Sequence, residues 1–346
     1  MTPADLSLTV LHAVRRAVDD GALRVDVPPL VKVERARPGG AGEYASNIAL
    51  TLARPAGRTA LDVAGILKER LRDAPGLQGV EITGPGFLNF SLRPDAGAEL
   101  VRAIRESAPA YDSGSDTTLS APALAAPTPS GGAFPPYGSS TALVGTVVRF
   151  AESAEARAAL VTETVVRLLR AQGADAGFGG AERIHVRPGA YDPTGLGVDA
   201  ARWALLRPAP QDRPLDGPPL LVQHERNPLF RVRYAHSRVR RLLVNGEQLR
   251  VTPAYETDID APALLGALGD HPAVLLAAAR HRAPDRVARH LETTADALLA
   301  FQHTVLPLGD EKPSAVHRSR LALAEAAGTV LAGGLSVLGI SAPDRI

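Results

Sequence analysis

Residues 108–140 consist almost entirely of Ala, Pro, Ser, Gly and Thr, with almost no charge and no hydrophobic periodicity. Such a composition cannot bury enough apolar surface to offset the entropy that is lost when a chain is ordered. We therefore predict a disordered linker over 107–140. A chain of 346 residues that is divided in this way is expected to fold as two or more domains, each with its own core.

Signals for helices and strands alternate before this linker. The predicted elements are a helix from Pro3, a strand at 30–34, a helix capped by Thr59, two strands within 80–92 and a helix over 94–105. The two strands are separated by Gly84-Pro85-Gly86, a typical turn sequence. Residues 1–106 are therefore predicted to form a small α/β domain.

Few regular elements are predicted directly after the linker. A strand at 143–150, a helix at 152–172 and a short strand at 183–187 stand among Gly- and Pro-rich segments. A complete nucleotide-binding domain needs several units of strand, crossover helix and parallel strand, at roughly 30 residues each. We therefore predict a degenerate α/β segment over 141–219.

The remainder of the chain, 220–346, is predicted to be an all-α helical bundle. Asn227-Pro228 has the sequence of a helix start, and Asn245-Gly246 has that of a helix stop. Further helices are predicted at 262–268, 272–282, 284–305 and 313–338. Together with the preceding parts, these helices predict an α+β multidomain protein.

The composition excludes several kinds of site. No cysteine is present, which excludes disulfides, cysteine nucleophiles and thiolate-bound zinc. The nine histidines include no pair at the i, i+3 or i, i+4 spacing that sets two imidazoles on one helix face, so no metal site is predicted. The formal net charge is only +1, so any nucleic-acid site must be a local one. No apolar run of about 18 residues predicts a membrane span, and a cytoplasmic location is expected.

The helix that follows Asn227 has an apolar side and a basic side. One series at helical spacing is expected to be buried: Leu229, Val232, His236, Val239 and Leu243. A second series, displaced by two residues, is expected to face solvent: Arg231, Tyr234, Arg238 and Arg241. No acidic residue occurs between Arg226 and Asn245, so these arginines lack carboxylates on their own helix, and the tyrosine adds a surface for stacking an unpaired base. The alternative is a solvated basic face whose partners come from elsewhere in the fold.

A second candidate site follows the Gly-Pro-Gly turn. Strand alternation puts Leu88, Phe90 and Leu92 on one face of the strand and Phe87, Asn89 and Ser91 on the other. An aromatic ring beside an amide suits stacking on a base and reading its edge. The alternative is that Phe87 packs under a helix and Asn89 caps a loop.

No site for nucleotide chemistry is evident. Neither of the two common phosphate-binding loop sequences is present. The chain has no lysine between Lys68 and Lys312, so a mechanism that sets a lysine on ATP phosphates in the middle of the chain lacks its residue. We therefore predict no catalytic residue.

Several segments resemble arginyl-tRNA synthetases, and they occur in the order expected of that family. Residues 42–50 (GEYASNIAL) and 84–90 (GPGFLNF) resemble its N-terminal additional domain. Residues 197–205 (GVDAARWAL) resemble the stretch that follows its second ATP signature. Residues 227–238 (NPLFRVRYAHSR) and 341–346 (SAPDRI) look like its helical anticodon-binding domain of the DALR type.

This resemblance implies tRNA as the partner, of the arginine type. In that family the N-terminal domain holds the D-loop of tRNA, and the aromatic and Asn of its motif read a D-loop base, which implicates Phe87 and Asn89. The helix with the Tyr-Ala-His-x-Arg motif lies against the anticodon loop. This implicates Tyr234 and Arg238, together with Arg231 and Arg241 on the same basic face. Arg231 stands where the family is usually aromatic, which implies a changed base preference or weaker discrimination.

The resemblance fails in the catalytic core. The family's His-x-Gly-His signature is absent, and its Lys-Met-Ser-Lys signature should precede Gly197, where residues 187–195 (RPGAYDPTG) stand instead. Adenylate formation needs positioned positive charge on the transferring phosphates, so the reaction is expected to be lost. We therefore predict a truncated, non-catalytic paralogue that binds tRNA without a cofactor. Two alternatives remain: an arginine–tRNA ligase with residual or partner-dependent activity, which would use ATP, and a protein-interaction module that binds a synthetase or another translation protein.

Overall fold

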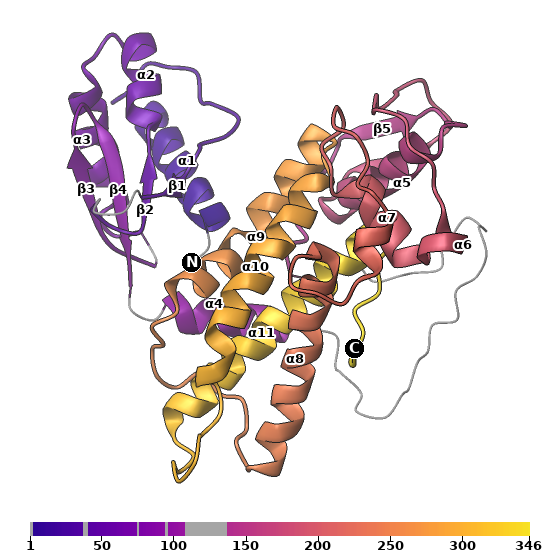
Figure 1. The fold of residues 1–346 in the computed structure, drawn as a ribbon. Coiled ribbons are helices and arrows are strands. Elements are labelled where there is room, and N and C mark those ends of the chain that lie inside the picture. The colour runs from indigo at the N-terminus through magenta and orange to yellow at the C-terminus, as the bar shows by residue number, and fades with distance from the viewer. Residues whose placement is uncertain (1–2, 37–40, 75, 94–95, 108–136) are drawn as a thin grey trace. The chain divides into compact units, whose positions relative to one another are not determined.

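The structure is a computed structural model, and it describes residues 3–36, 41–74, 76–93, 96–107 and 137–346 (Figure 1). It divides into two compact units, Met1–Leu100 and Val101–Ile346. Most of the predicted linker, residues 108–136, lies outside the described part of the chain.

The first unit is a four-stranded antiparallel sheet with helices packed on it. Its elements are α1 (Pro3–Asp19), β1 (Glu34–Arg35), β2 (Tyr44–Ser46), α2 (Ile48–Ala56), α3 (Ala60–Leu71), β3 (Leu77–Thr83), β4 (Phe87–Leu92) and the start of α4 (Ala96–Glu106). The strand order is β1-β2-β4-β3. Helix α3 contacts α1, α2 and β3, and the core between these elements is apolar.

Local sequence signals account for most of this unit. Thr59 caps α3 through a capping box, since its hydroxyl accepts from the Asp62 amide and the Asp62 carboxylate accepts from the Thr59 amide. The hairpin β3–β4 forms across the predicted Gly-Pro-Gly turn. The strand predicted at 30–34 is wrong except for Glu34, because the sheet extends only to Glu34 and Arg35, which pair with β2.

The second unit combines one βαβ unit with a bundle of long helices. Its remaining elements are β5 (Val147–Phe150), α5 (Ala156–Ala171), β6 (Asp175–Phe178), α6 (Pro193–Leu196), α7 (Val198–Leu206), α8 (Pro228–Gln248), α9 (Pro262–His281), α10 (Asp285–Phe301) and α11 (Ala315–Leu338), with short 3-10 turns at Pro218–Leu221 and Gln302–Thr304. The predicted bundle and the predicted degenerate segment lie in the same compact unit.

The βαβ unit differs in part from the prediction. Strands β5 and β6 are parallel neighbours, with α5 as the crossover between them. The strand predicted at 183–187 is wrong, and its place is taken by β6 at Asp175–Phe178. The reason is tertiary: β6 pairs along β5, whereas the amide of Arg187 donates to the carbonyl of Pro210. Helix α5 then packs against α7, α9 and α11.

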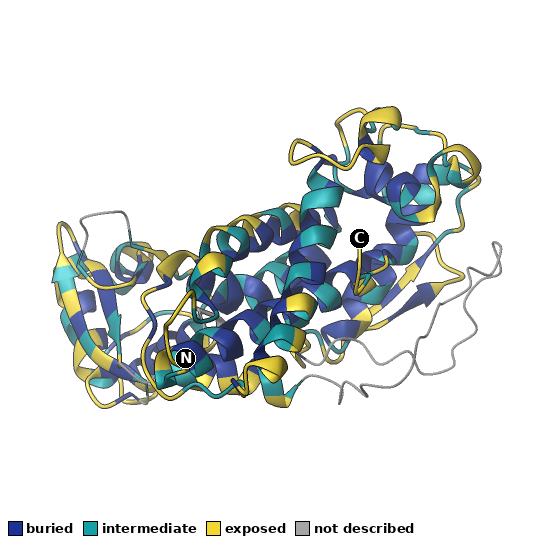
Figure 2. Ribbon diagram, turned by 60° about the horizontal axis from the view of Figure 1, so that its bottom comes forward, coloured by how far each residue is buried: buried dark blue, intermediate teal, exposed yellow. Residues whose placement is uncertain are grey.

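The bundle is built around α11, which contacts α5, α8, α9 and α10 (Figures 1 and 2). Within the described residues, α9 and α11 are long and apolar enough to cross a membrane by composition alone. Half of the apolar window of α9 and 78% of that of α11 are buried inside the fold. A helix that is surrounded by other helices is expected to be apolar on every side, and this position explains the composition of α11.

Three expectations about this unit are wrong. Helix α9 runs through Pro272 as one helix rather than two, because packing along α10 outweighs the hydrogen bond that proline removes. Helix α8 continues past Gly246, where a Cβ atom would lie 2.6 Å from a methyl group of Leu321, so this glycine permits close helix packing instead of ending the helix. The predicted linker includes residues 137–140, but Tyr137 is buried and its hydroxyl donates to the carbonyl of Leu268.

Candidate nucleic-acid interface

Helix α8 starts at a tightly held cap. The Oδ1 atom of Asn227 accepts from the amide of Phe230 at 3.2 Å, as predicted for an N-cap. Its Nδ2 atom donates to the carbonyls of Leu220 and Val222 at 2.8 and 2.9 Å. The cap therefore fixes both the first turn of α8 and the chain that leads into it.

The apolar stripe predicted on α8 is confirmed with one shift. Leu229, Val232, His236 and Val239 are all buried, and at the fourth turn Leu242 is buried while Leu243 is half-buried. Burial lowers the pKa of His236, although its Nδ1 atom lies 3.0 Å from the carbonyl oxygen of Pro343. This imidazole is thus part of the core and not of the basic surface.

The predicted outer face of α8 carries a stacked aromatic pair. Tyr234 is half-buried, and its ring stacks on that of Phe230 with 5.6 Å between centroids and 17° between planes. Phe230 was not among the predicted site residues, although its i, i+4 spacing to Tyr234 is a sequence signal for such a pair. The pair lies on the same helix as the predicted arginines, and both rings are partly accessible to solvent.

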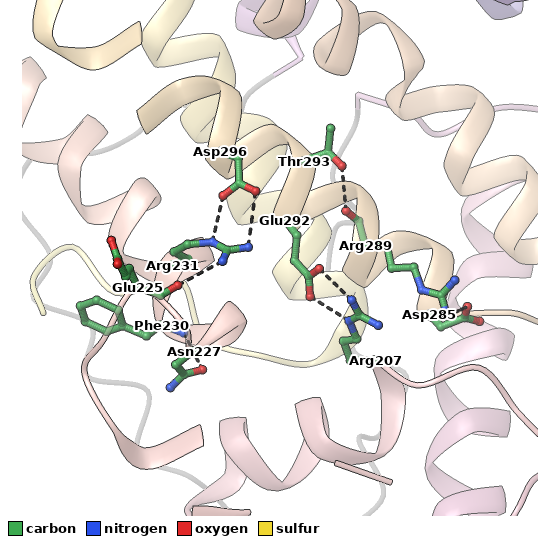
Figure 3. A network of polar contacts seen from close by, with 10 residues as sticks. All are labelled: Arg207, Glu225, Asn227, Phe230, Arg231, Asp285, Arg289, Glu292, Thr293 and Asp296. Atoms are coloured by element: carbon green, nitrogen blue, oxygen red, sulfur yellow. Dashed lines mark hydrogen bonds and ion pairs between the residues drawn. The ribbon is translucent and has the colours of Figure 1, made fainter. Parts of the chain in front are cut away.

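Arg231 differs from the other arginines of this face because a carboxylate pairs with it. Its Nε atom lies 2.9 Å from Oδ1 of Asp296 in α10, and its Nη2 atom donates to Oδ2 of that residue at 3.4 Å (Figure 3). Its Nη1 atom also donates to the carbonyl of Glu225. Arg231 has no carboxylate on its own helix, as the sequence indicates, but it has one from α10, 65 residues away in the sequence. The alternative reading, a basic residue paired from elsewhere in the fold, holds for this position.

Arg238 and Arg241 have no carboxylate partner among the described residues. The Nε atom of Arg238 donates to the neutral amide oxygen of Gln302 at 2.7 Å. Arg241 is exposed and makes no ion pair or hydrogen bond with any described residue. Together with Tyr234, these two arginines form what we call the open face of α8.

The arginines on the other side of the open face have carboxylate partners. Arg233 lies 3.4 Å from the carboxylate of Asp199 in α7, and Arg240 lies 3.0 Å from that of Asp344 near the C-terminus. The positive potential of α8 is therefore concentrated at the open face, between two neutralised flanks.

The N-terminal candidate site is only partly accessible. The sheet register puts Phe87 opposite Thr83 and Asn89 opposite Glu81, so the two residues share a face as predicted. Phe87 is 39% exposed, so it does not pack under a helix, whereas Asn89 is only 6% exposed. The Nδ2 atom of Asn89 donates to Oγ1 of Thr83 at 2.7 Å. Asn89 is thus buried in the hairpin and hydrogen-bonded within it.

The middle of the chain is organised by one buried arginine. Arg157, in the first turn of α5, is fully buried, and its five N–H groups donate to five backbone carbonyls at 2.7 to 3.1 Å: those of Arg187, Leu205, Pro208, Ala209 and Asp212. Every donor of the guanidinium is used. The N-cap residue Glu155 also accepts from the amide of Gly189. Residues 187–212 are therefore clamped onto the start of α5.

The described residues contain no group of three or more side chains suited to hold a metal ion. The clamped segment includes residues 187–195, which stand where the second ATP signature of the resembled family would lie. Its carbonyls bind Arg157, which is a side chain of the protein's own core.

Two protein-family models match the chain, one at each end. The model described as the arginyl tRNA synthetase N terminal domain matches residues 8–92, and that of the DALR anticodon binding domain matches residues 232–346. They lie on either side of residues 93–231. The candidate residues on α8 from position 232 onward, and both residues of the hairpin, fall within these matches.

Related proteins agree with the two models. The chain is 27% identical to a protein named arginine–tRNA ligase from Frankia alni and 26% identical to one from Renibacterium salmoninarum, each alignment covering all of both chains. The first alignment runs over 556 positions, so at least 210 of them have no counterpart in this chain of 346 residues. The shortening that the sequence predicts is therefore confirmed.

Solved structures agree in fold. The arginyl-tRNA synthetase of Thermus thermophilus superposes with a TM-score of 0.66 at 12% identity, over all of both chains. That of Plasmodium falciparum gives 0.63 at 8% identity, over 99% of both chains. The N-terminal model, the anticodon-binding model and the end-to-end relatives together assign this chain to the arginyl-tRNA synthetase family.

Proposed function

We propose that this protein is a non-catalytic relative of arginyl-tRNA synthetases that binds tRNA of the arginine type. In this proposal the open face of α8 contacts the anticodon loop, and the hairpin at Phe87 contacts the D-loop. The observation that carries it is the open face itself: Tyr234 stacked on Phe230, with Arg238 and Arg241 beside it and no carboxylate paired to either arginine among the described residues.

The chemistry of this face suits an unpaired stretch of RNA. Arginine binds phosphate through its planar fork, and an aromatic ring adds stacking that is worth about 1–3 kcal/mol per base. Single-stranded loops are where proteins read RNA sequence, because only unstacked bases can lie against side chains. The neutralised flanks at Arg231 and Arg240 confine this chemistry to one strip of the helix.

A filter-binding titration against total tRNA at several salt concentrations tests the proposal. We expect an affinity that falls with salt, because bound phosphates release counterions. Arg241→Ala removes an unpaired charge and is expected to weaken binding and to lower the salt slope by roughly 1. Arg240→Ala is the matched control: it is the preceding residue on the same helix, but its charge is paired with Asp344. Binding that is absent, or insensitive to salt, contradicts the proposal, and so do equal effects of the two substitutions.

The non-catalytic part of the proposal rests on the middle of the chain. Residues 187–195 are clamped by Arg157, and no lysine occurs between Lys68 and Lys312. Transfer of a phosphoryl or adenylyl group depends on positioned positive charge. We expect no arginine-dependent exchange of pyrophosphate into ATP above a control without protein. Exchange above that control would identify the protein as a ligase with residual activity, and exchange only with an added protein would identify partner-dependent activity.

Purification of the chain from cells tests the remaining alternative, a protein-interaction module. RNA that co-purifies with the chain and is released by salt supports the tRNA-binding role. A synthetase or other translation protein that co-purifies without RNA would favour an interaction module instead. The cytoplasm, where tRNA is charged and used, is the location that the proposal requires.

A further inference from the structure

A short basic segment follows the βαβ unit of the second compact unit. Along residues 183–187 (RIHVR), basic and apolar side chains alternate in the sequence. Exposure alternates in the same way: the basic residues Arg183, His185 and Arg187 are exposed, and the apolar residues Ile184 and Val186 are half-buried. In an extended chain, side chains two positions apart lie on the same face. The three basic side chains therefore face solvent together.

The arginines of this segment carry unpaired charge. Neither Arg183 nor Arg187 makes an ion pair or a side-chain hydrogen bond with any described residue. Arg213 is also exposed and has no such contact within the described chain. It lies close to the segment, because Nη1 of Arg157 binds the carbonyls of both Arg187 and Asp212, at 2.9 and 2.7 Å. We call Arg183, His185, Arg187 and Arg213 the basic strip.

The carboxylates next to the basic strip in the sequence interact with other arginines. Glu182 lies 3.1 Å from Nε of Arg282, at the end of α9. Asp212 lies close enough to the buried Arg157 to interact with its charge. Neither carboxylate forms an ion pair with the basic strip among the described residues. The strip therefore keeps a positive potential at the surface.

The backbone beneath the basic strip is held in place. The amide of Ala151 donates to the carbonyl of Glu182, and the amide of Arg187 donates to the carbonyl of Pro210. The clamp at Arg157 holds the carbonyl of Arg187 as well. A ligand that binds here has to order side chains only, which lowers the entropic cost of binding.

The chemistry of the strip suits a row of phosphates. Side chains two positions apart in an extended chain are roughly 6–7 Å apart, close to the separation of neighbouring phosphates along one strand of RNA. The planar fork of a guanidinium matches the oxygens of a phosphate. Residues 181–190 contain no aromatic side chain on which an unpaired base could stack. The strip therefore favours a duplex, whose bases are stacked inside, over an unpaired loop.

We propose that the basic strip binds the phosphate backbone of base-paired RNA, whatever its sequence. This surface is separate from the open face of α8 and from the hairpin at Phe87, so it goes beyond the two loop contacts of the proposed function. The regular spacing and the forked donors favour RNA over a flexible acidic peptide, whose carboxylates have no fixed separation.

The test is a titration of the full chain with a blunt-ended RNA duplex, which offers no unpaired loop, followed by fluorescence anisotropy at several salt concentrations. We expect an affinity that falls with salt. Arg183→Ala and Arg187→Ala should each weaken binding roughly three- to tenfold at low salt and lower the salt slope by roughly 1. Arg149→Ala is the matched control, since this exposed arginine of β5 is already paired with Asp175 at 2.6 Å. It is expected to leave duplex binding nearly unchanged.

The remaining measurements decide what the strip recognises. Arg241→Ala should leave duplex binding unchanged, because Arg241 lies in the open face. Absence of duplex binding overturns the inference, and so do equal effects of Arg149→Ala and Arg183→Ala. Equally tight binding of polyglutamate would indicate an acidic protein partner, and complete competition by ATP would indicate a site for a single nucleotide; either result overturns the inference.

A parallel titration with tRNA separates this inference from the proposed function. If the duplex does not bind but tRNA does, and Arg241→Ala weakens tRNA binding, the inference is overturned and the proposed function stands. If the duplex binds through Arg183 and Arg187 but Arg241→Ala has no effect on tRNA binding, the inference is supported and the proposed role of the open face is overturned.

Discussion

Arg231 of α8 and Asp296 of α10 form a two-pronged contact, with Nε 2.9 Å from Oδ1 and Nη2 3.4 Å from Oδ2. The pair closes one side of the basic face that the proposed function assigns to RNA. A carboxylate at this point both anchors α8 to α10 and removes one positive charge from the surface. The Arg231–Asp296 pair therefore limits the unpaired positive charge of α8 to the open face.

Asp296→Asn is expected to strengthen RNA binding. The substitution releases the charge of Arg231 next to Arg238, so the affinity for tRNA at low salt should rise about two- to fivefold and the salt slope should steepen by up to roughly 1. Stability should change by less than about 1 kcal/mol, since the pair is partly exposed. Filter binding across a salt series measures the effect. Asp26→Asn, an exposed carboxylate in the first unit, is the control for net charge, and an equal gain from it would refute the local explanation.

A second ion pair connects the middle segment to the bundle. Arg207, at the end of α7, donates from Nε and Nη2 to the two carboxylate oxygens of Glu292 in α10, at 2.8 and 3.0 Å (Figure 3). This hydrogen bonding raises the pKa of Arg207. Glu292 is only 14% exposed, so the pair is poorly screened by solvent.

We expect a coupling energy of about 1–2 kcal/mol between these residues. The measurement is a double-mutant cycle with Arg207→Ala, Glu292→Ala and both together, by urea denaturation of the full chain. Arg149→Ala and Asp175→Ala form a matched cycle on an exposed pair, for which a smaller coupling is expected because solvent screens the two charges. A smaller coupling at Arg207 than at Arg149 would show that the α7–α10 contact does not hold the two parts together.

Arg157→Ala is expected to be among the most destabilising single substitutions in the second unit. Five carbonyls would lose their donor, at about 1 kcal/mol or more each, so the loss should reach at least about 3 kcal/mol. Arg157→Lys keeps the charge but has three donors and should recover only part of this stability. Limited proteolysis should cut residues 187–212 first in both variants. A melting temperature close to that of the parent chain would show that the clamp is dispensable.

Two buried histidines predict a loss of stability in acid. His271 and His290 lie with ring centroids 5.2 Å apart, and one nitrogen of each lacks a hydrogen-bond partner. Burial lowers the pKa of His290 from 6.5 to about 4, and burial lowers that of His271 well below 6.5. Both rings are therefore neutral in the fold at pH values where the unfolded chain binds protons.

The direction of the pH dependence of stability follows from this difference in proton binding between the folded and unfolded states. Between pH 6.5 and about 4 the unfolded state binds more protons, so the free energy of unfolding is largest above pH 6.5 and decreases as the pH falls toward 4, by up to about 1.4 kcal/mol per pH unit for each histidine. Urea denaturation at a series of pH values measures this slope. His290→Gln should reduce it, whereas His281→Gln, an exposed position, should leave it unchanged. A parent chain with no slope in this range would contradict the assignment.

The sequence by itself determined the elements whose signals are local. Thr59 and Asn227 cap their helices with hydrogen bonds that span three residues, and the predicted turn at Gly84-Pro85-Gly86 joins the two strands of the hairpin. The apolar stripe of α8 follows from helical periodicity alone. These features depend on neighbours within a few positions, which a sequence displays directly.

Only the tertiary structure decided which of these residues remain available. Arg231 and Arg241 look alike in the sequence, but Asp296 neutralises the first from 65 residues away and nothing described pairs with the second. Gly246 continues a helix because Leu321 packs against it, and Asn89 turns its nitrogen inward because Thr83 lies across the hairpin. Charge pairing, close packing and amide orientation depend on partners brought near by folding, and no local pattern specifies them.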